Sequence, residues 1–192
     1  MAISPQILAF SASTRKDSFN KKLVAVAARG ATEAGARVTL LDLKEYPLSV
    51  YDGDDEAAKG MPENALKLKA LFLAHDGLLI SSPEYNSSYP GGFKNMIDWV
   101  SRPAGGKPLA EFEGKFAVIM NATTGMGGGA RMLPTLRVLL SNLRINVLAD
   151  QFGLTKASEA FTPEGDLKDE AQKKTALGLG RKLAETIAKI RA

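Results

Sequence analysis

The chain of 192 residues contains no cysteine and only one histidine, His75. The absence of cysteine excludes disulfides, thiol catalysis and metal centres held by thiolates, such as zinc or iron–sulfur sites. A single histidine cannot by itself build a histidine metal site. His75 lies near the end of an expected helix, where we interpret it as a partner for the helix C-terminus. We therefore predict neither a metal centre nor thiol chemistry.

The sequence also lacks a long apolar run and a strong excess of one charge. No apolar stretch approaches the length of a membrane span, and the chain does not open with a basic segment followed by an apolar one. The 25 basic and 21 acidic residues are interspersed, with a formal net charge of +4 and no basic stripe that carries aromatic side chains. These absences argue against a membrane partner and against nucleic-acid binding, and they favour a modest attraction for anionic ligands. We expect a soluble, cytoplasmic protein.

What the sequence does contain is an alternation of short apolar runs and helical patterns. Its hydrophobic content of 45% and charged content of 24% are ordinary for a globular protein, and a chain of this length can bury a full core. No linker, repeat or low-complexity segment divides it. We therefore expect one domain that spans residues 1–192. The five expected strands are Gln6–Ser11, Arg37–Leu43, Gly77–Ser82, Lys115–Met120 and Ile145–Leu148.

The helical patterns have apolar residues at spacings of three and four. The expected helices run through Ser18–Ala34, Leu68–Phe72, Phe93–Val100, Met132–Leu143 and Ala176–Ile190. Several strands are nearly continuous apolar runs, which is typical of strands covered on both faces of a parallel sheet. The predicted fold class is α/β: a doubly wound, flavodoxin-like domain with a five-stranded parallel sheet of order 2-1-3-4-5 and helices on both faces. The acidic segment Lys44–Pro62 is expected to be an irregular loop, functional or flexible.

The stretch Ser11–Asn20 joins the first strand to the first helix and is rich in hydroxyl groups. Ser18 is a good N-cap residue, and a helix N-terminus offers free N–H groups and a partial positive charge. Arg15 adds a permanently charged, planar donor. These features suit a phosphate group, and the alternative is an ordinary capped helix with a surface arginine.

Two further strand ends carry unusual residues. In the order 2-1-3-4-5 the first, third and fourth strands are neighbours, so the loops that follow them share one crevice. The loop Pro83–Pro90 offers a proline, polar side chains and the Tyr85 ring, which suit a flat heteroaromatic ring. The turn Thr123–Gly129 is rich in glycine and allows close approach of the backbone to a ligand. The alternatives are a polar turn with a surface tyrosine and a flexible glycine turn.

Three stretches carry a resemblance to a known family. They are Ser13-x-Arg15-x-x-Ser18-x-Asn20; Pro83-Glu84-Tyr85-Asn86 followed by Gly91-x-x-Lys94-Asn95-x-x-Asp98-Trp99; and the glycine-rich turn after the fourth strand. Together they resemble the NADPH-dependent FMN reductase family, which includes flavodoxin-like quinone, azo-dye and chromate reductases. The resemblance extends over residues 6–144. It implies FMN as cofactor, NAD(P)H as donor, and a homodimer or homotetramer.

The resemblance also implies which residues hold the cofactor. Those that would hold the FMN phosphate are Ser11, Ser13, Arg15, Ser18 and Asn20, with the backbone of Phe19 close by. Those that would border the isoalloxazine ring and the ribityl chain are Pro83, Glu84, Tyr85 and Asn86. Those that would line the far edge of the ring are Thr123, Thr124, Gly125 and Gly128. The chain departs from the family at Ala12, where a glycine is common, and at the Thr123-Thr124 pair, which leaves open which threonine faces the ring.

The same resemblance implies a function. FMN would pass a hydride from NADPH or NADH to a small-molecule acceptor (quinone, azo dye, chromate or flavin) with ping-pong kinetics and no catalytic residue of the protein. Glu84 has no evident partner acid, so we expect a structural or ligand-orienting role for it. Trp99 lies on the flank of the third expected helix, and we expect a partner chain to bury it. The alternative is a tryptophan of the chain's own core.

Other function classes remain open. An FMN electron carrier without NAD(P)H reductase activity is disfavoured by the basic balance and by Arg15, because such flavodoxins tend to be acidic and to lack this arginine. A flavin-free Rossmann dehydrogenase is suggested by Gly125-x-Gly127-x-x-Ala130 with Asp150 further on. That motif follows the fourth strand instead of the first, and it leaves the first two loops without a role. A non-enzymatic interaction domain explains none of the three loops.

Overall fold

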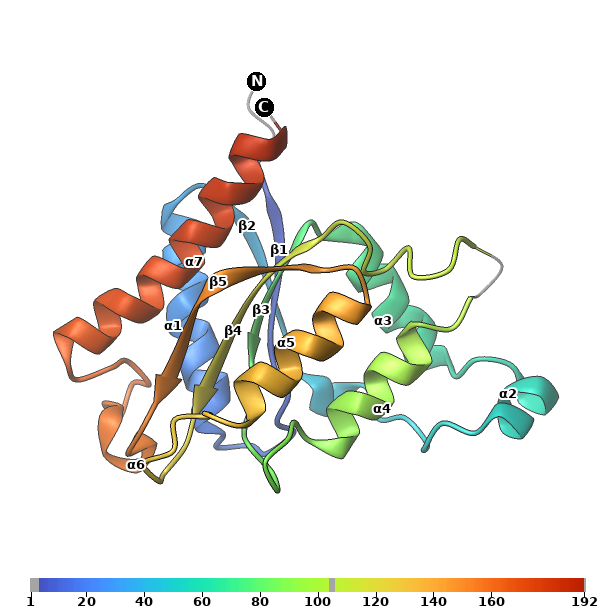
Figure 1. The fold of residues 1–192 in the computed structure, drawn as a ribbon, viewed down its shortest axis with the longest axis horizontal. Coiled ribbons are helices and arrows are strands. Elements are labelled where there is room, and N and C mark those ends of the chain that lie inside the picture. The colour runs from blue at the N-terminus through green and yellow to red at the C-terminus, as the bar shows by residue number, and fades with distance from the viewer. Residues whose placement is uncertain (1–3, 104–105, 192) are drawn as a thin grey trace.

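In a computed structural model, which describes residues 4–103 and 106–191, the protein consists of a five-stranded parallel sheet with helices on both faces (Figure 1). The strands are β1 (Gln6–Ser11), β2 (Arg37–Leu41), β3 (Gly77–Ser81), β4 (Phe116–Ala122) and β5 (Asn146–Leu154). Their order is β2-β1-β3-β4-β5, and every neighbouring pair is parallel. The predicted fold class and strand order are confirmed.

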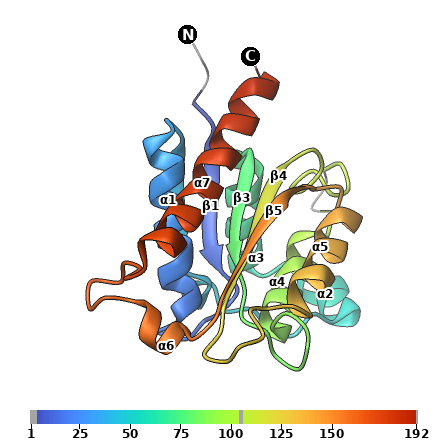
Figure 2. The same cartoon turned by 60° about the vertical axis from the view of Figure 1, so that its left-hand side comes forward.

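The described residues form seven α-helices. They are α1 (Phe19–Glu33), α2 (Gly53–Lys59), α3 (Glu63–Ala74), α4 (Gly91–Val100), α5 (Met132–Asn142), α6 (Ala157–Ala160) and α7 (Glu170–Arg191), with a 3-10 turn at Leu43–Glu45. Helices α1 and α7 cover one face of the sheet, and α3, α4 and α5 cover the other (Figures 1 and 2). Within the described ranges, no helix combines the length and apolar character needed to cross a bilayer.

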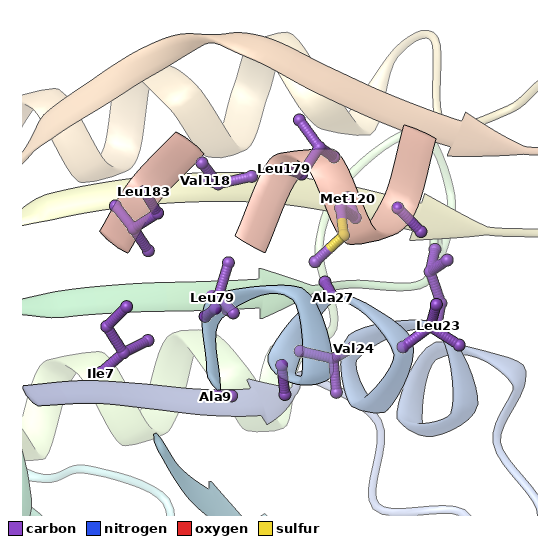
Figure 3. Close-up of a cluster of buried hydrophobic side chains, with 14 of the residues drawn as sticks. Ile7, Ala9, Leu23, Val24, Ala27, Leu79, Val118, Met120, Leu179 and Leu183 are labelled. Carbon is purple, nitrogen blue, oxygen red and sulfur yellow. The ribbon is translucent and has the colours of Figure 1, made fainter. Parts of the chain in front are cut away.

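The apolar strand runs explain why both faces are covered. Successive residues of a strand point to opposite faces, so Ile7 and Ala9 pack under α1 and α7 while Leu8 and Phe10 pack under the other layer. Figure 3 shows the first of these clusters, in which side chains of α1 and α7 meet those of the sheet. Each face needs its own helices because a run without polar residues has no side that suits water.

Helices α1 and α7 approach each other so closely that two positions in the contact require glycine. A Cβ atom on Gly30 would overlap the carbonyl oxygen of Leu177, and one on Gly180 would overlap that of Ala27. The absence of a side chain lets the two backbones touch. The position of α1, and of the loop at its start, therefore depends on α7.

Several local predictions need correction. The segment Lys44–Pro62 is not irregular throughout, because the 3-10 turn extends into it and α2 lies within it. The N-cap of α2, Asp52, accepts the N–H groups of Asp54 and Asp55. The fifth strand extends to Leu154 and contains a bulge, and Ile190 is 61% exposed instead of facing the core.

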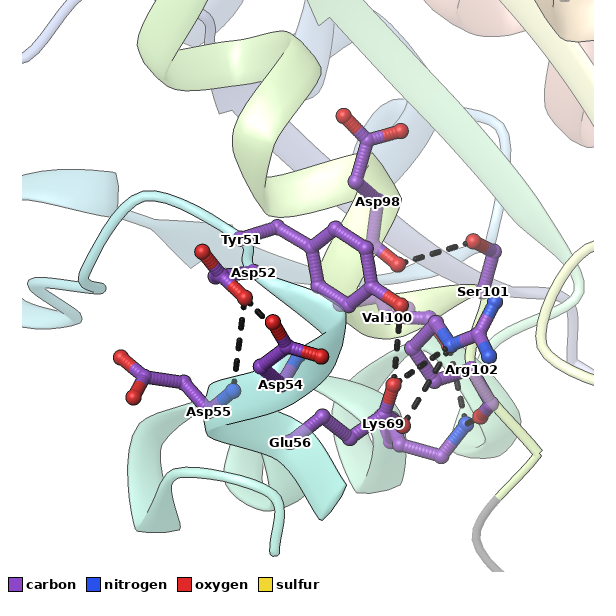
Figure 4. Close-up of polar contacts among 10 residues, drawn as sticks. All are labelled: Tyr51, Asp52, Asp54, Asp55, Glu56, Lys69, Asp98, Val100, Ser101 and Arg102. Atoms are coloured by element: carbon purple, nitrogen blue, oxygen red, sulfur yellow. Dashed lines mark hydrogen bonds and ion pairs between the residues drawn. The ribbon is translucent and has the colours of Figure 1, made fainter. Parts of the chain in front are cut away.

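The segment that carries α2 extends away from the sheet but is tied to α4 by side chains (Figures 1 and 4). The Tyr51 hydroxyl donates to Glu56 at 2.9 Å, and Nε of Arg102 donates to the same carboxylate at 3.0 Å. Trp99 is 1% exposed within the single chain, where its Nε1–H donates to the Ser49 carbonyl and its ring meets Tyr51 edge-on. The prediction that a partner chain buries Trp99 is therefore wrong, because this segment of the same chain covers it.

The predicted role of His75 at the end of a helix is confirmed. His75 follows the last residue of α3, and its Nδ1–H donates to the Leu71 carbonyl at 2.6 Å. Its Nε2 lies 2.8 Å from the Thr39 hydroxyl on β2. Both ring nitrogens have partners, so the ring joins the end of α3 to the edge of the sheet.

Candidate functional site

Three loops meet at the carboxyl edge of the sheet, at the lower side of Figure 1, because β1, β3 and β4 are adjacent. They are residues 12–18 after β1, residues 82–90 after β3 and residues 123–131 after β4. Between them lies a hollow of 180 Å³. Its lining residues are Ser13, Arg15, Ser18, Phe19, Asn20, Pro83, Glu84, Tyr85, Ala122, Thr123 and Thr124. Ala122 is the lining residue that the sequence does not predict, and the predicted residues Ser11, Asn86, Gly125 and Gly128 do not line the hollow.

The loop after β1 presents donors to this hollow. Ser18 occupies the N-cap position of α1, as predicted, but its side chain makes no capping hydrogen bond. The Ser11 hydroxyl oxygen accepts the N–H of Ser13, and the Ser13 oxygen accepts the N–H of Arg15. These hydroxyls therefore keep their own hydrogens for donation. Arg15 is exposed and pairs with no carboxylate among residues 4–103 and 106–191, so its guanidinium can bind an anion.

Asn20 connects the start of α1 to two strands. Its side-chain oxygen accepts the Ser81 hydroxyl and the N–H of Ala122, both at 2.8 Å, and its amide nitrogen donates to the Ala122 carbonyl at 2.9 Å. The side chain is 3% exposed. Asn20 thus fixes the N-terminus of α1 against the ends of β3 and β4.

The loop after β3 contains a tight turn with an unusual backbone. The backbone N–H and carbonyl groups of Tyr85 and Ser88 bond each other at 2.8 and 3.1 Å. The central residues Asn86 and Ser87 have φ values of 49° and 67°, as a type I′ turn requires. A serine in the left-handed region costs conformational energy, which marks the loop as a constrained one. The turn holds Tyr85 beside the hollow with 48% of its surface exposed.

Glu84 binds the start of α5 with its side chain. One carboxylate oxygen accepts the N–H groups of Arg131 at 3.3 Å and Met132 at 3.0 Å. The first turn of α5 contains no acidic residue of its own, so Glu84 supplies the negative charge that a helix N-terminus favours. Glu84 thus has a structural contact with α5, and the residue lines the hollow as well.

The glycine-rich turn after β4 packs against β5. Gly128 has a φ of +53°, and its carbonyl oxygen lies where a Cβ atom on Gly153 would stand. Glycine is therefore required at position 153 because the backbone of Gly128 packs directly against it. Thr123 and Thr124 face the hollow instead, and the Thr123 hydroxyl oxygen accepts the N–H of Gly125 at 3.3 Å.

One buried residue beside the site was missed by the sequence-based prediction. Asn121 is fully buried at the end of β4, its amide donates to the Ser82 carbonyl at 2.8 Å, and its side-chain oxygen has no partner in the described part of the chain. A polar residue directly after the apolar run Phe116–Met120 is the signal that could have identified it. Asn121 ties the loop after β3 to β4.

The chemistry of the donors suits a phosphate attached to a planar ring. The lining residues include Ser13 and Ser18, which carry hydroxyl groups, Arg15 with its guanidinium, and Phe19 and Asn20 at the start of α1. Such donors bind a phosphate dianion through charge-assisted hydrogen bonds. The other lining residues include the ring of Tyr85 and the threonine pair. The residues present therefore fit a phosphorylated heteroaromatic cofactor.

Comparison with known proteins gives a consistent result. The family model described as NADPH-dependent FMN reductase matches residues 5–159. An NAD(P)H-dependent FMN reductase of Pseudomonas aeruginosa is 35% identical over 166 residues, which cover 86% of this chain and 85% of that protein. A quinone reductase of Escherichia coli is 36% identical over 135 residues, or 70% of this chain and 69% of that protein. The solved structure of FerB, a flavoenzyme NAD(P)H:(acceptor) oxidoreductase from Paracoccus denitrificans, matches with a TM-score of 0.81 and 30% identity, covering 96% of this chain and 98% of that one.

Proposed function

The chain belongs to the NADPH-dependent FMN reductase family, and from this premise we propose that it is an FMN-dependent oxidoreductase that transfers a hydride from NAD(P)H to a small-molecule acceptor. Membership of this family implies FMN as the cofactor and NAD(P)H as the co-substrate. We propose quinones as the acceptor class because relatives that match most of the chain are named quinone reductase and NADPH:quinone oxidoreductase. Azo dyes, chromate and free flavin are the acceptors to compare with them.

The observation that carries this proposal is the set of donors at the start of α1. Ser13, Ser18 and Arg15, with the N–H groups of Phe19 and Asn20, would hold the FMN phosphate. At about 1.5–3 kcal/mol each, roughly three to six charge-assisted hydrogen bonds amount to about 8 kcal/mol, the free energy of micromolar binding. Ser11 would hold this loop in place, because its hydroxyl oxygen accepts the N–H of Ser13.

The other two loops would border the isoalloxazine ring. The loop after β3 would contribute Pro83, Glu84, Tyr85 and Asn86, and the turn after β4 would contribute Thr123, Thr124, Gly125 and Gly128. When bound, FMN would supply the redox chemistry between NAD(P)H and the acceptor, and we expect alternating half-reactions with ping-pong kinetics. The protein's own residues bind and orient. Glu84, a carboxylate beside the hollow, is engaged with α5, so we assign no proton transfer to it.

The test is to purify the protein, identify any bound flavin and follow NADPH oxidation with a simple benzoquinone. We expect flavin-dependent turnover and parallel double-reciprocal lines when the two substrates are varied. Bound FMN without NADPH oxidation would instead indicate an electron carrier. Oxidation of NADPH by flavin-free protein would indicate a Rossmann dehydrogenase. The Rossmann dehydrogenase is disfavoured because Asp150 lies in the middle of β5, where its carboxylate pairs with Lys182 of α7.

We also propose a homodimer or homotetramer that acts in the cytoplasm, where NAD(P)H is available. Support for association comes from the family resemblance, and the projecting segment that carries α2, on which no residue of the helix is buried, is the surface to examine first. Light scattering that reports only the monomer mass would contradict the assembly.

A further inference from the structure

The contact of Glu84 with α5 joins two loops that are distant in the sequence. The acceptor and the two donor residues, Arg131 and Met132, are 47 and 48 positions apart. Arg131 stands at the N-cap position of α5 and makes no capping hydrogen bond with its own side chain. A carboxylate from the loop after β3 therefore does the work that an N-cap residue usually does.

The place of Glu84 in its loop gives this contact a second consequence. Glu84 lies between Pro83 and Tyr85, and all three line the hollow. On the far side of Tyr85 the chain enters the constrained turn at Asn86 and Ser87. The position of the Tyr85 ring is thus set from two sides, by the anchored carboxylate before it and by the turn after it.

A second contact joins the same two loops. The Asn121 amide donates to the carbonyl of Ser82, two residues before Glu84. On its other side Asn121 meets the glycine-rich turn, because a Cβ atom on Gly129 would overlap the Asn121 side chain. The loop after β3 and the turn after β4 are therefore coupled without a ligand, through Glu84 at the surface and Asn121 in the core.

We propose that Glu84 is a positioning residue for the flavin ring: its carboxylate, held at the N-terminus of α5, fixes the Tyr85 loop and the glycine-rich turn as one unit. This inference rests on the proposed function. Because the two loops are already ordered before the ligand binds, the entropic cost of ordering them does not reduce the affinity. Glu84 belongs to the ring end of the site and Arg15 to the phosphate end. Loss of Glu84 should therefore weaken FMN and riboflavin by the same factor, about tenfold.

The experiment compares Glu84→Ala and Glu84→Gln with Asp52→Ala. Glutamine keeps the shape and an acceptor oxygen but removes the charge. Asp52 is the matched control because its carboxylate caps α2 in the same way, accepting the N–H of Asp54 at 2.8 Å, far from the hollow. Two quantities are measured: amide hydrogen exchange at Arg131 and Met132 in flavin-free protein, and the dissociation constants of FMN and riboflavin.

We expect faster exchange at both amides and about tenfold weaker binding of both flavins in Glu84→Ala, with Glu84→Gln between this variant and the wild type. Asp52→Ala should leave both affinities unchanged. Faster exchange with unchanged flavin affinity would overturn the inference, because Glu84 would then only cap α5. Unchanged exchange would overturn it as well, because the contact would be absent in solution. A wild-type protein that binds neither flavin would remove the proposed function, and the inference with it.

Discussion

At the scale of single residues, the loop after β1 and the start of α1 contain two kinds of residue: candidate ligands for an anion and residues that hold the loop in place. Arg15 is exposed and has a free guanidinium among the described residues, whereas Asn20 is buried and uses its amide on Ser81 and Ala122. The motif Ser13-x-Arg15-x-x-Ser18-x-Asn20 therefore combines candidate ligands with a residue that holds them in place. The two kinds predict different consequences of substitution.

Arg15→Ala should weaken FMN at least tenfold and leave riboflavin nearly unchanged, because only FMN carries the phosphate. The size follows from one charge-assisted contact of about 1.5–3 kcal/mol. Fluorescence titration of flavin-free protein measures both affinities. Lys16→Ala is the control, since Lys16 is an exposed neighbour that does not line the hollow. Equal losses for the two flavins would mean that Arg15 is not a phosphate ligand.

Asp166 makes folding stability depend on pH in acid. Lys173 and Arg29 hold its carboxylate, and together they lower the pKa of Asp166 from 3.8 to about 2. A carboxylate whose pKa is lowered by folding stabilises the protein above pH 4 and loses that contribution as the pH falls toward 2. Asp166→Asn should therefore be less stable than the wild type at pH 6, by at most about 2 kcal/mol, with the difference falling to well under about 1 kcal/mol near pH 2. Urea unfolding at both pH values measures it, and a constant difference would contradict this assignment.

At the scale of elements, the bounds predicted from the sequence are correct where the apolar pattern is strong. The bounds of β1 agree with the prediction because Ile7–Phe10 is a continuous apolar run. Helix α2 was missed because none of its residues is buried, so it has no apolar period, and its start depends on the Asp52 cap. The second half of β5 was missed because this edge strand is half exposed and carries Asp150 and Gln151. Capping and edge position leave no hydrophobic signal.

The contact between α1 and α7 predicts opposite effects for two glycines two residues apart. A Cβ atom on Gly180 would overlap the backbone of α1, whereas one on Gly178 would meet open space. Gly180→Ala should cost about 1–3 kcal/mol of unfolding free energy, as overpacking does. Gly178→Ala should be neutral or stabilising by up to about 1 kcal/mol, because alanine favours the helix. Urea unfolding of both variants measures this, and equal midpoints would show that α7 does not pack on α1 in this way.

At the scale of the whole molecule, the parallel order of the sheet brings the three loops together. Sequence motifs identified the loops, and the topology explains why Ser13, Tyr85 and Thr123 line one hollow although they are far apart in the chain. The contacts of Asn20 and the cap that Glu84 gives to α5 could not be predicted. They depend on the direction of single side chains between distant loops, which residue types and spacing do not specify. The burial of Trp99 was misassigned for the same reason.

The central claim is that FMN binds in this hollow with its phosphate at the start of α1. Calorimetric titration of the flavin-free wild-type protein with FMN, and separately with riboflavin, tests it most directly. The account predicts one FMN per chain with a dissociation constant of micromolar or below, and riboflavin binding at least about tenfold weaker. Absence of FMN binding, or equal affinity for the two flavins, would contradict it.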